Sequence, residues 1–524
     1  MKSILEYCPK QFELREHQIE ILRQVEAAWD KHFVITIPAG VGTGKSLIGQ
    51  TIARWANTKK LSVGTITPRN KLQDQYTDSF PDVPSLKGRG KYQCEQLKMS
   101  CSEGKELLGG LSHAYCSECP IQIAKEETIG SNNAIFNFQS YLLNKCTKNV
   151  VIIDEAHNAL GVLEDSYTTI LWQHKFNYPD NMNTCGEVAI WLEEVIKKET
   201  AKFKLLEEAI LPHKETDLAS VSSAIKRDVM KLRKSHTNLS RQINKYKQVR
   251  RGLDKAPDNF FIERVEELYA GRKQPALKIR PTTLDGLPPV LWGKHTRKLI
   301  LMSGTINEID IQDMGLGRRT CAIIKAQDPI DLKRKPFVVE NLINMGYKYQ
   351  DKNLPKMVAK IRDIMSRHAD TKGVIHTTYG LAKKFQTQLN DTRVLYHTSE
   401  NREEVLETFL TSEEPVVLVA CGMSEGLDLA GEAFGFQMIT KVMWPNKKDK
   451  LIDYRYKNNM PRILWDTVRT IRQQKGRIVR GPSDYGVTYM LDSAFGNVRL
   501  RRRGLFQQTI SLWGDSFVNS IEWR

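Results

Sequence analysis

The chain has 524 residues, and at roughly 150 residues per domain this length predicts about three or four domains. Hydrophobic residues make up 40% and charged residues 27% of the sequence. This composition fits a globular protein and excludes the disordered, collagen-like and small disulfide-stapled classes. Lys and Arg outnumber Asp and Glu by 78 to 61, a net charge of +17. An excess of this sign favours a polyanionic partner, with a basic protein that binds no polymer as the alternative.

The sequence predicts no membrane association. No stretch approaches the ~20 consecutive apolar residues that a membrane-spanning helix needs, and the first ten residues lack the apolar core of a signal peptide. We therefore expect a cytoplasmic protein, located at the nucleoid or in the cytoplasm of a host cell. In a reducing compartment, most of the nine cysteines should be buried thiols unless they cluster.

The first part of the chain predicts alternating helices and strands. An amphipathic helix is expected over residues 12–30, and a short buried strand over Val34–Ile37. A glycine-rich turn and an apolar helix, Leu47–Trp55, come next. Strand, turn and helix in this order open a βαβ unit. Further strands are predicted at Leu61–Thr67 and Val150–Ile153.

A helical insertion is predicted between about residues 165 and 285, where strand signals thin out. Apolar residues there recur at spacings of three, four and seven, as on one face of a helix. They are Ile225, Val229, Leu232, Leu239, Ile243, Tyr246, Val249 and Leu253. The other face is basic, with Lys226, Arg227, Lys231, Arg233, Lys234, Arg241, Lys245, Lys247, Arg250 and Arg251.

The α/β pattern returns with a predicted strand at Lys298–Met302, and a second α/β half begins near residue 337. The strands predicted in this half are Gly373–Thr377, Arg393–Tyr396, Val416–Ala420, Phe436–Val442 and Gly486–Leu491. Two α/β halves of this kind can pack with a cleft between them.

A phosphate-binding loop is predicted between the first strand and its helix. Its residues are Ala39, Gly40, Val41, Gly42, Thr43, Gly44, Lys45 and Ser46. Only Ala39 departs from the usual pattern, which has glycine there. Glycines let backbone N–H groups close around phosphate oxygens, and the helix presents its positive end to the same phosphates. We expect Lys45 to reach the β- and γ-phosphates of ATP and Ser46 to ligate Mg²⁺.

Two adjacent carboxylates, Asp154 and Glu155, end the apolar strand Val150–Ile153. Alone, such a pair is usually a solvated turn. Together with a phosphate loop it predicts catalysis, because Asp154 can hold Mg²⁺ and Glu155 can orient or activate the attacking water.

A pair of arginines, Arg477 and Arg480, is predicted to share one face of a helix. The planar guanidinium suits the charge that spreads over a transferring phosphoryl group. If two halves close over one nucleotide, these residues could act as arginine fingers. A basic surface helix is the alternative.

Taken together, the motifs resemble superfamily 2 helicases of the XPD/DinG type. The matching segments are the DEAH box (Asp154, Glu155, Ala156 and His157), motif Ia (Thr67–Gln75), motif III (Ser303–Thr305), motif IV (Lys372–Tyr379), motif V (Ser424–Gly431), motif VI (Gln473, Gly476, Arg477 and Arg480) and a nucleotide-end element with Arg15 and Gln18.

The resemblance implies a role for each matching residue. Lys45, Asp154, Glu155, His157, Gln473, Arg477 and Arg480 would be catalytic. Arg15, Gln18, Glu425 and Asp428 would join the phosphate loop in binding the nucleotide.

The resemblance also implies an α/β fold with two RecA-like parallel-sheet motor domains, a small cysteine-cluster domain and a helical, Arch-like insertion. The first motor domain would comprise residues 1–86, 120–164 and 286–335, the cluster domain 87–119, the insertion 165–285 and the second motor domain 336–524.

Four cysteines, Cys94, Cys101, Cys116 and Cys119, fall within 26 residues. Four thiolates suit a [4Fe–4S] cluster or a Zn²⁺ site, and by themselves they favour zinc. The segments Leu86–Cys94 and Cys119–Pro120 resemble the family's flanks of its iron–sulfur cysteines, which favours [4Fe–4S]. A loop without metal is the third possibility.

From the resemblance we expect an ATP- and Mg²⁺-dependent DNA helicase, monomeric, that moves 5′ to 3′ on single-stranded and forked DNA. The alternatives are a DNA-stimulated ATPase or translocase subunit that does not unwind, and a nucleic-acid-binding scaffold with a vestigial ATPase. RNA also remains a possible substrate, because phosphate contacts and base stacking work on both polymers. The sequence does not indicate protein partners.

Overall fold

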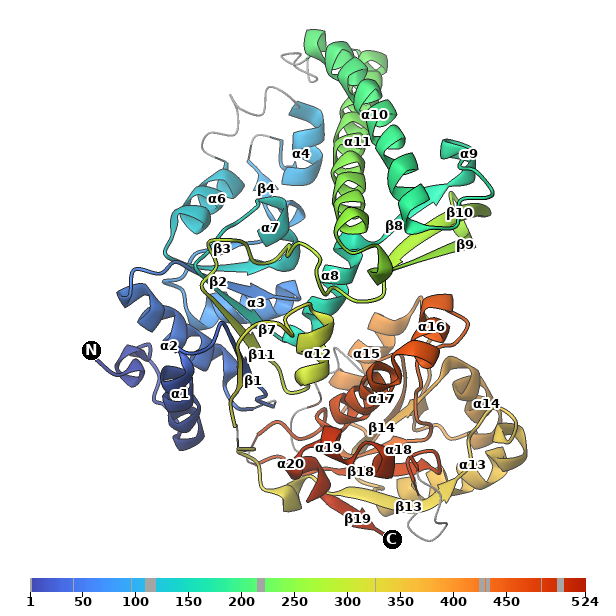
Figure 1. The fold of residues 1–524 in the computed structure, drawn as a ribbon. Coiled ribbons are helices and arrows are strands. Elements are labelled where there is room, and N and C mark those ends of the chain that lie inside the picture. The colour runs from blue at the N-terminus through green and yellow to red at the C-terminus, as the bar shows by residue number, and fades with distance from the viewer. Residues whose placement is uncertain are drawn as a thin grey trace. The chain divides into compact units, whose positions relative to one another are not determined.

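The structure, a computed structural model, describes residues 2–40, 42–95, 97–108, 119–213, 222–325, 327–423, 429, 434–481, 483–496 and 504–524. The chain forms two compact units (Figure 1). The first comprises Met1–Pro38 and Lys45–Lys325, and the second comprises Ala39–Gly44 and Ala326–Arg524.

The first unit is built on a seven-stranded sheet in which all neighbouring strands are parallel. Its strands, in spatial order, are β12 (Cys321–Ile323), β1 (Val34–Ile37), β11 (Lys298–Met302), β7 (Val150–Asp154), β2 (Val63–Thr67), β6 (Asn133–Asn137) and β3 (Ser85–Leu86). Strands β1, β7 and β2 are buried along their whole length, as expected when helices cover both faces of a parallel sheet. The strands predicted in this unit are therefore confirmed.

Helices of the first unit connect these strands. They are α1 (Glu16–Ala28), α2 (Lys45–Thr58), α3 (Asn70–Ser79), α6 (Pro120–Gly130), α7 (Phe138–Leu143), α8 (Ala159–Tyr167) and α12 (Glu308–Asp313). In a parallel sheet the carboxyl ends of the strands share one edge. The segments after β1, β2, β7 and β11 therefore meet there, and these are the four segments that carry the predicted phosphate loop, motif Ia, the DEAH box and motif III.

The cysteine-containing segment departs from the sheet after β3. It forms a short 3₁₀ turn at Arg89–Lys91, the antiparallel pair β4 (Gln93–Cys94) and β5 (Met99–Ser100), and helix α4 (Cys101–Leu108). The chain returns to the sheet through α6.

The predicted helical insertion has two long helices, α10 (Cys185–Ile210) and α11 (Ser223–Lys255), which lie side by side (Figure 1). It also has a short helix, α9 (Gln173–Phe176), and a three-stranded antiparallel sheet that the sequence analysis did not predict. The strands of this sheet are β8 (Thr169–Trp172), β10 (Arg272–Pro281) and β9 (Phe260–Tyr269).

This sheet was not predicted, because charged residues in β9 and β10 interrupt the alternation of apolar and polar side chains that is typical of a strand. Across the two strands they form ion pairs, Arg280 with Glu263 and Lys278 with Glu267. The basic face of α11 also needs a correction. Arg233, which was predicted on this basic face, is buried. Its guanidinium donates a hydrogen bond to the His213 carbonyl at 2.7 Å.

The second unit contains another seven-stranded sheet in which all neighbouring strands are parallel. Its strands, in spatial order, are β15 (Val394–Leu395), β16 (Val417–Cys421), β14 (Lys372–Thr377), β17 (Phe434–Ile439), β18 (Val487–Asp492), β13 (Phe337–Ile343) and β19 (Ile521–Trp523). The five strands predicted here are confirmed, while β13 and β19 were not predicted. The expectation of an α/β protein with two RecA-like parallel-sheet domains is thus confirmed.

The helices of the second unit are α13 (Gln350–Arg367), α14 (Tyr379–Leu389), α15 (Arg402–Thr411), α16 (Lys450–Asn458), α17 (Met460–Lys475), α18 (Leu505–Gln508), α19 (Ile510–Trp513) and α20 (Asp515–Val518). Part of the core lies between α13 and the sheet, where Met357, Ile361 and Ile364 are fully buried.

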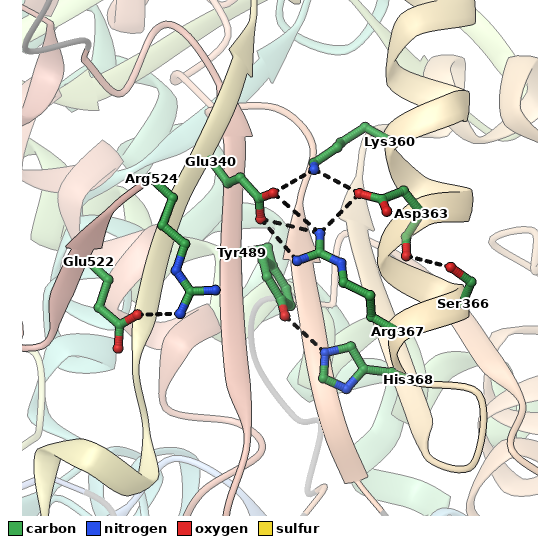
Figure 2. A network of polar contacts seen from close by, with 9 residues as sticks. All are labelled: Glu340, Lys360, Asp363, Ser366, Arg367, His368, Tyr489, Glu522 and Arg524. Carbon is green, nitrogen blue, oxygen red and sulfur yellow. Dashed lines mark hydrogen bonds and ion pairs between the residues drawn. The ribbon is translucent and has the colours of Figure 1, made fainter.

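A polar network fastens α13 to strand β13 (Figure 2). The Glu340 carboxylate on β13 accepts hydrogen bonds from Lys360 at 2.7 Å and from Arg367 at 3.2 Å. Burial acts to raise the pKa of Glu340, but Lys360 and Arg367 outweigh it and hold this pKa below its ordinary value. The guanidinium of Arg367 also lies over the Tyr489 ring of β18, 5.2 Å from its centroid. Helix α13 is therefore held to two strands by one cluster.

We expect Glu340→Gln to lower the free energy of unfolding by about 1–3 kcal/mol, because two cations would lose their charged acceptor. Denaturant unfolding measures the change. Glu522→Gln is the matched control, since Glu522 pairs with Arg524 where both side chains are about half exposed, and such pairs contribute about 0–1 kcal/mol.

The same variant has a predictable pH dependence. A carboxylate whose folded-state pKa is lowered stabilises the fold above the ordinary pKa of 4.5, and this stabilisation is lost as the pH falls through the lowered value. The difference between Glu340→Gln and the parent should therefore shrink in acid. Equal effects of the two substitutions at neutral pH would contradict the importance of the network.

Candidate functional site

The loop between β1 and α2 has the backbone of a phosphate loop. Gly42 and Gly44 have φ values of 81° and 73°, the left-handed region that glycine adopts without strain. Ala39 is not among the described residues with positive φ, so alanine is tolerated where the usual pattern has glycine. The Thr43 hydroxyl donates a hydrogen bond to the Gly40 carbonyl at 2.8 Å. Val41 lies outside the described residues.

Helix α2 begins at Lys45, directly after this loop, and Ser46 lies in its first turn. The positive end of the helix dipole and the side chains of both residues are thus placed for an anion at the carboxyl end of β1.

Asp154 is the buried carboxylate of the site, with 2% of its surface exposed. Its Oδ1 accepts a hydrogen bond from the backbone N–H of Glu155 at 2.8 Å, and its Oδ2 accepts one from the Tyr76 hydroxyl at 2.9 Å. Burial raises the pKa of Asp154 to about 6, although the Lys45 cation acts to lower it. A carboxylate in this environment is prepared for a cation, because a cation would offset the cost of its burial.

Glu155 lies between two other predicted site residues. It has a left-handed backbone conformation, with φ 48° and ψ 49°, which is uncommon for a residue with a side chain. Its Oε1 lies 3.2 Å from Lys45 Nζ, and its Oε2 lies 3.4 Å from His157 Nδ1. The structure therefore brings Lys45, Asp154, Glu155 and His157 together, as the sequence analysis predicted.

His157 connects this cluster to the segment after β11. Its Nδ1 lies 2.7 Å from the hydroxyl of Ser303, which is completely buried, and its Nε2 lies 3.1 Å from the Asn158 amide. The Ser303 hydroxyl also accepts the backbone N–H of Thr305 at 3.1 Å. Contacts of 3.2, 3.4 and 2.7 Å thus join Lys45, Glu155, His157 and Ser303 in series.

Tyr76, on α3, is a site residue that the sequence analysis missed. It is 1% exposed, and its hydroxyl bonds Asp154. The available signal was its position six residues beyond Asn70, in a helix that follows a strand of the same sheet. That position alone does not distinguish a core aromatic from a functional one.

The element with Arg15 and Gln18 lies at the start of α1. Gln18 is buried, and its side-chain oxygen accepts the backbone N–H of Arg15 at 2.9 Å. This bond fixes the first turn of the helix. The role of these two residues toward a nucleotide stays a prediction.

Motif VI of the second unit differs from its predicted conformation. Gln473 lies in the last turn of α17, but the helix ends at Lys475, with Gly476 as its cap. Arg477 and Arg480 therefore lie in the following turn and do not share a helix face. The Asp484 carboxylate shapes this turn by accepting the backbone N–H groups of Arg480 and Gly481 at 2.8 and 2.7 Å. Glu425 and Asp428 lie outside the described residues.

A buried polar network supports this turn. Gln437 on β17 donates to the Lys475 carbonyl at 3.2 Å, and its oxygen lies 3.0 Å from His376 Nε2 on β14. Burial and the nearby Arg477 cation lower the pKa of His376 to about 4, against the effect of Gln437. A neutral histidine thus lies near a predicted catalytic arginine.

Lys475 itself is 9% exposed, and its ammonium group donates to the Ser520 hydroxyl and lies 4.7 Å from the centroid of the Phe517 ring. Burial lowers the pKa of Lys475 to about 7, helped by the charges of Lys335 and Arg472 and opposed by Asp328.

Three of the four clustered cysteines are described, and all three are buried: Cys94 on β4, Cys101 at the start of α4 and Cys119 just before α6. A Cβ placed on Gly104 of α4 would come within 3.2 Å of the Cys94 sulfur, so Cys94 packs directly against this helix. Cys116 lies outside the described residues. Among the described residues, no group of three or more His, Cys, Asp or Glu side chains is arranged to hold a metal ion. The predicted metal site is therefore not shown.

We expect Lys475→Met to change the pH dependence of stability. An unfolded lysine keeps its proton up to a pH of about 10.4. Because folded Lys475 loses its proton near pH 7, the stability of the parent should rise between these values. The melting temperature of the variant relative to the parent should therefore fall from pH 6 to pH 9.

Lys457→Met is the matched control, because Lys457 is 71% exposed, and it should show a constant difference from the parent. A constant difference for Lys475→Met as well would contradict a neutral buried lysine.

Family models match segments of both units. A family model described as type III restriction enzyme, res subunit, matches residues 11–181, and the helicase C-terminal domain model matches residues 361–507. The 3′-5′ exonuclease DinG of Staphylococcus aureus is 24% identical over 184 residues. This match covers 33% of the chain but only 20% of that protein, and the exonuclease activity in its name is that protein's.

Solved structures show the same fold. The structure of S. tokodaii Xpd4 covers 97% of this chain with all of its own, at a TM-score of 0.52 and 16% identity. An XPD helicase structure covers 98% of this chain with all of its own, at a TM-score of 0.59 and 14% identity.

In the part of the chain that the structure describes, no helix is long and apolar enough to cross a membrane. The family models, the DinG relative and the XPD structures all point to a helicase. The contacts among Lys45, Glu155, His157 and Ser303 fit such a protein, because they join the phosphate loop to the DEAH box and motif III. The chain therefore carries a helicase C-terminal domain match over residues 361–507 and resembles the superfamily 2 helicases of the XPD/DinG type.

Proposed function

We propose that this protein is an ATP-driven DNA helicase that translocates 5′ to 3′ on single-stranded DNA and unwinds duplex. The observation that carries the proposal is the series of contacts from Lys45 through Glu155 and His157 to Ser303. It joins a phosphate-binding lysine, a carboxylate for water activation and the segment after β11. This is the connection that a motor needs between hydrolysis and movement.

At the nucleotide, Lys45 exchanges its ion pair with Glu155 for the β- and γ-phosphate oxygens of ATP. Glu155 is then available to orient the attacking water and to accept its proton. Ser46 and Asp154 fit Mg²⁺ as oxygen ligands, and the ion would neutralise charge that develops on the phosphates. Asp154 is suited to this role because it is buried beside the phosphate lysine and already makes two hydrogen bonds that orient its carboxylate.

We assign supporting roles to the remaining nucleotide-site residues. Arg15 and Gln18 bind the base end of the nucleotide, and the backbone of residues 39–44, together with Glu425 and Asp428 of motif V, completes the site. Gln473, Arg477 and Arg480 act on the γ-phosphate. For Arg477 and Arg480 the support is a firmly held turn, because flexible arginines would lose more entropy on binding.

Single-stranded DNA fits the charge and the exposed aromatic residues. The chain carries a net charge of +17. Tyr379 and Trp444, 41% and 38% exposed, follow β14 and β17, so both lie at the carboxyl edge of the second sheet. Cations can contact phosphates there while aromatic rings stack on bases. Binding should therefore depend steeply on salt and weakly on sequence.

Lys45→Ala and Glu155→Gln should each reduce DNA-stimulated ATP hydrolysis by on the order of 10²–10³-fold, because each removes a group that acts in the transition state. A coupled phosphate-release assay measures the loss. Circular dichroism should show an unchanged fold, since neither residue belongs to the core. Turnover within a factor of two of the parent in both variants would overturn the motor assignment and revive a scaffold with a vestigial ATPase.

A strand-displacement assay with 5′-tailed and 3′-tailed duplexes tests direction and unwinding. Displacement only of the 5′-tailed duplex supports the proposal, and displacement only of the 3′-tailed duplex contradicts the direction. ATP hydrolysis without displacement of either duplex would indicate a translocase or an ATPase subunit. RNA substrates in the same assay test the preference for DNA.

We further propose that Cys94, Cys101, Cys116 and Cys119 bind a [4Fe–4S] cluster, with Zn²⁺ as the alternative occupant of the same thiolates. The burial of the three described thiols supports a structural role. A cluster bound there would hold a segment with few apolar residues, because binding free energy becomes folding free energy.

Anaerobically purified protein should be brown, and Cys116→Ser should remove the colour and increase proteolysis within residues 87–119. Absorbance spectra and metal analysis measure the occupant. Cys146→Ser, outside the cluster, is the control and should retain the colour. A colourless parent that contains zinc would show the alternative occupant.

A further inference from the structure

Helix α3 joins two regions of the first unit that the proposed motor must coordinate. At its start, Arg69, Asn70 and Lys71 are exposed at the carboxyl end of β2, in motif Ia. Six residues further, about 9 Å along the helix axis, Tyr76 is completely enclosed. One rigid element thus has a polar, solvent-facing start and a buried end.

The hydroxyl of Tyr76 contacts both residues to which we assign Mg²⁺. It donates to Asp154 Oδ2 at 2.9 Å, and it is also hydrogen-bonded to the side chain of Ser46. Asp154 lies at the end of β7, while Ser46 lies in the first turn of α2. A single oxygen of α3 is therefore the common partner of two ligands that come from different elements.

The remainder of the Tyr76 side chain is held by apolar contacts. Its ring packs in a small cluster with Phe80, Val83 and Ile135, and the centroids of the Tyr76 and Phe80 rings are 6.0 Å apart. The ring position, and with it the hydroxyl, follows the position of α3.

The start of α3 is held differently, by polar contacts to neighbouring strands. Gln73 is buried and donates to Ser85 Oγ at 2.9 Å and to the Leu86 carbonyl at 3.0 Å. The Asn137 amide donates to the Asn70 side chain at 3.2 Å. The hydrogen bond of the exposed Asn70 can be exchanged when a phosphate binds to this turn, whereas the buried Gln73 and the packed ring of Tyr76 must move with the helix.

We propose that Tyr76 is a positioning residue that couples strand binding at the start of α3 to the geometry of the Mg²⁺ ligands Asp154 and Ser46. The proposal rests on the proposed function, since it assumes that single-stranded nucleic acid contacts motif Ia and that Mg²⁺–nucleotide binds beside Asp154. It predicts that the two ligands raise each other's affinity and that the Tyr76 hydroxyl carries this effect. Coupling between two sites is reciprocal, so either affinity can report it.

Tyr76→Phe tests the proposal because it removes the hydroxyl and keeps the packed ring. The affinity of the full-length protein for mant-ADP with Mg²⁺ is measured by fluorescence, with and without a single-stranded oligothymidylate. In the parent we expect the oligonucleotide to raise this affinity by about tenfold, a usual size for coupling between sites. In Tyr76→Phe the oligonucleotide should no longer raise the affinity for mant-ADP, so the ratio of the two affinities falls to about one. The affinity of this variant for the oligonucleotide alone should stay unchanged.

Tyr141→Phe is the matched control. Tyr141 is 2% exposed in the same unit, but its hydroxyl is hydrogen-bonded to the backbone of Lys148, so the variant should keep the coupling of the parent. Melting temperatures of both variants, compared with the parent, report any general loss of packing. A half-saturating Mg²⁺ concentration that rises in Tyr76→Phe but not in Tyr141→Phe would give independent support.

The outcomes separate this inference from the proposed function. If parent and Tyr76→Phe show the same coupling factor, Tyr76 is only a packing residue and the inference is overturned. If the parent binds mant-ADP equally well with and without oligonucleotide, the inference fails together with the coupled motor. Equal loss of coupling in Tyr76→Phe and Tyr141→Phe would show general loosening of the unit and would also overturn it.

Discussion

The buried charge of Asp154 is the constraint around which the first unit is organised. A carboxylate that is 2% exposed is costly unless its oxygens are bonded and a cation lies near. Three elements meet this requirement: α2 brings Lys45, α3 brings the Tyr76 hydroxyl, and the turn after β7 supplies the N–H of Glu155. Satisfying one buried charge therefore places several of the residues to which we assign roles in the proposed ATP hydrolysis.

The parallel sheet makes this convergence possible. Its strands end at one edge, so segments separated by more than a hundred residues in sequence, such as His157 and Ser303, come into direct contact there. The two large insertions interrupt the chain without interrupting the sheet. The cysteine segment leaves after β3 and returns through α6, and the helical insertion leaves after α8 and returns before β11. Both can therefore vary in structure while the nucleotide-binding edge is retained.

In the second unit, polar contacts likewise hold the turn that carries Arg477 and Arg480. The backbone after α17 is held by Asp484, and its support from below is a chain of buried polar groups through Gln437 and His376. Lys475 adds a contact to the segment around Ser520, which links the turn to the strand at the sheet edge. The arginines of motif VI thus extend from a rigid base. A rigid base would suit the role that we propose for these arginines, because groups that meet a transient charge act best without reorganising.

The sequence by itself determined the features that depend on neighbouring residues. Strands such as Val34–Ile37 and Val150–Ile153 were visible as short apolar runs, and the phosphate loop was visible because only particular residues allow its backbone. The assignment of Lys45, Asp154, Glu155 and His157 to one nucleotide site came from the motifs that these residues match. Only the tertiary structure decided the role of Tyr76, the burial of Arg233, the pairing of β9 with β10 and the end of α17 before Arg477. Each of these features depends on partners that are distant in the chain. A local sequence pattern does not say which distant group will bond a buried hydroxyl or a buried cation. Nor does it say which strand will pair with another or where a helix will end.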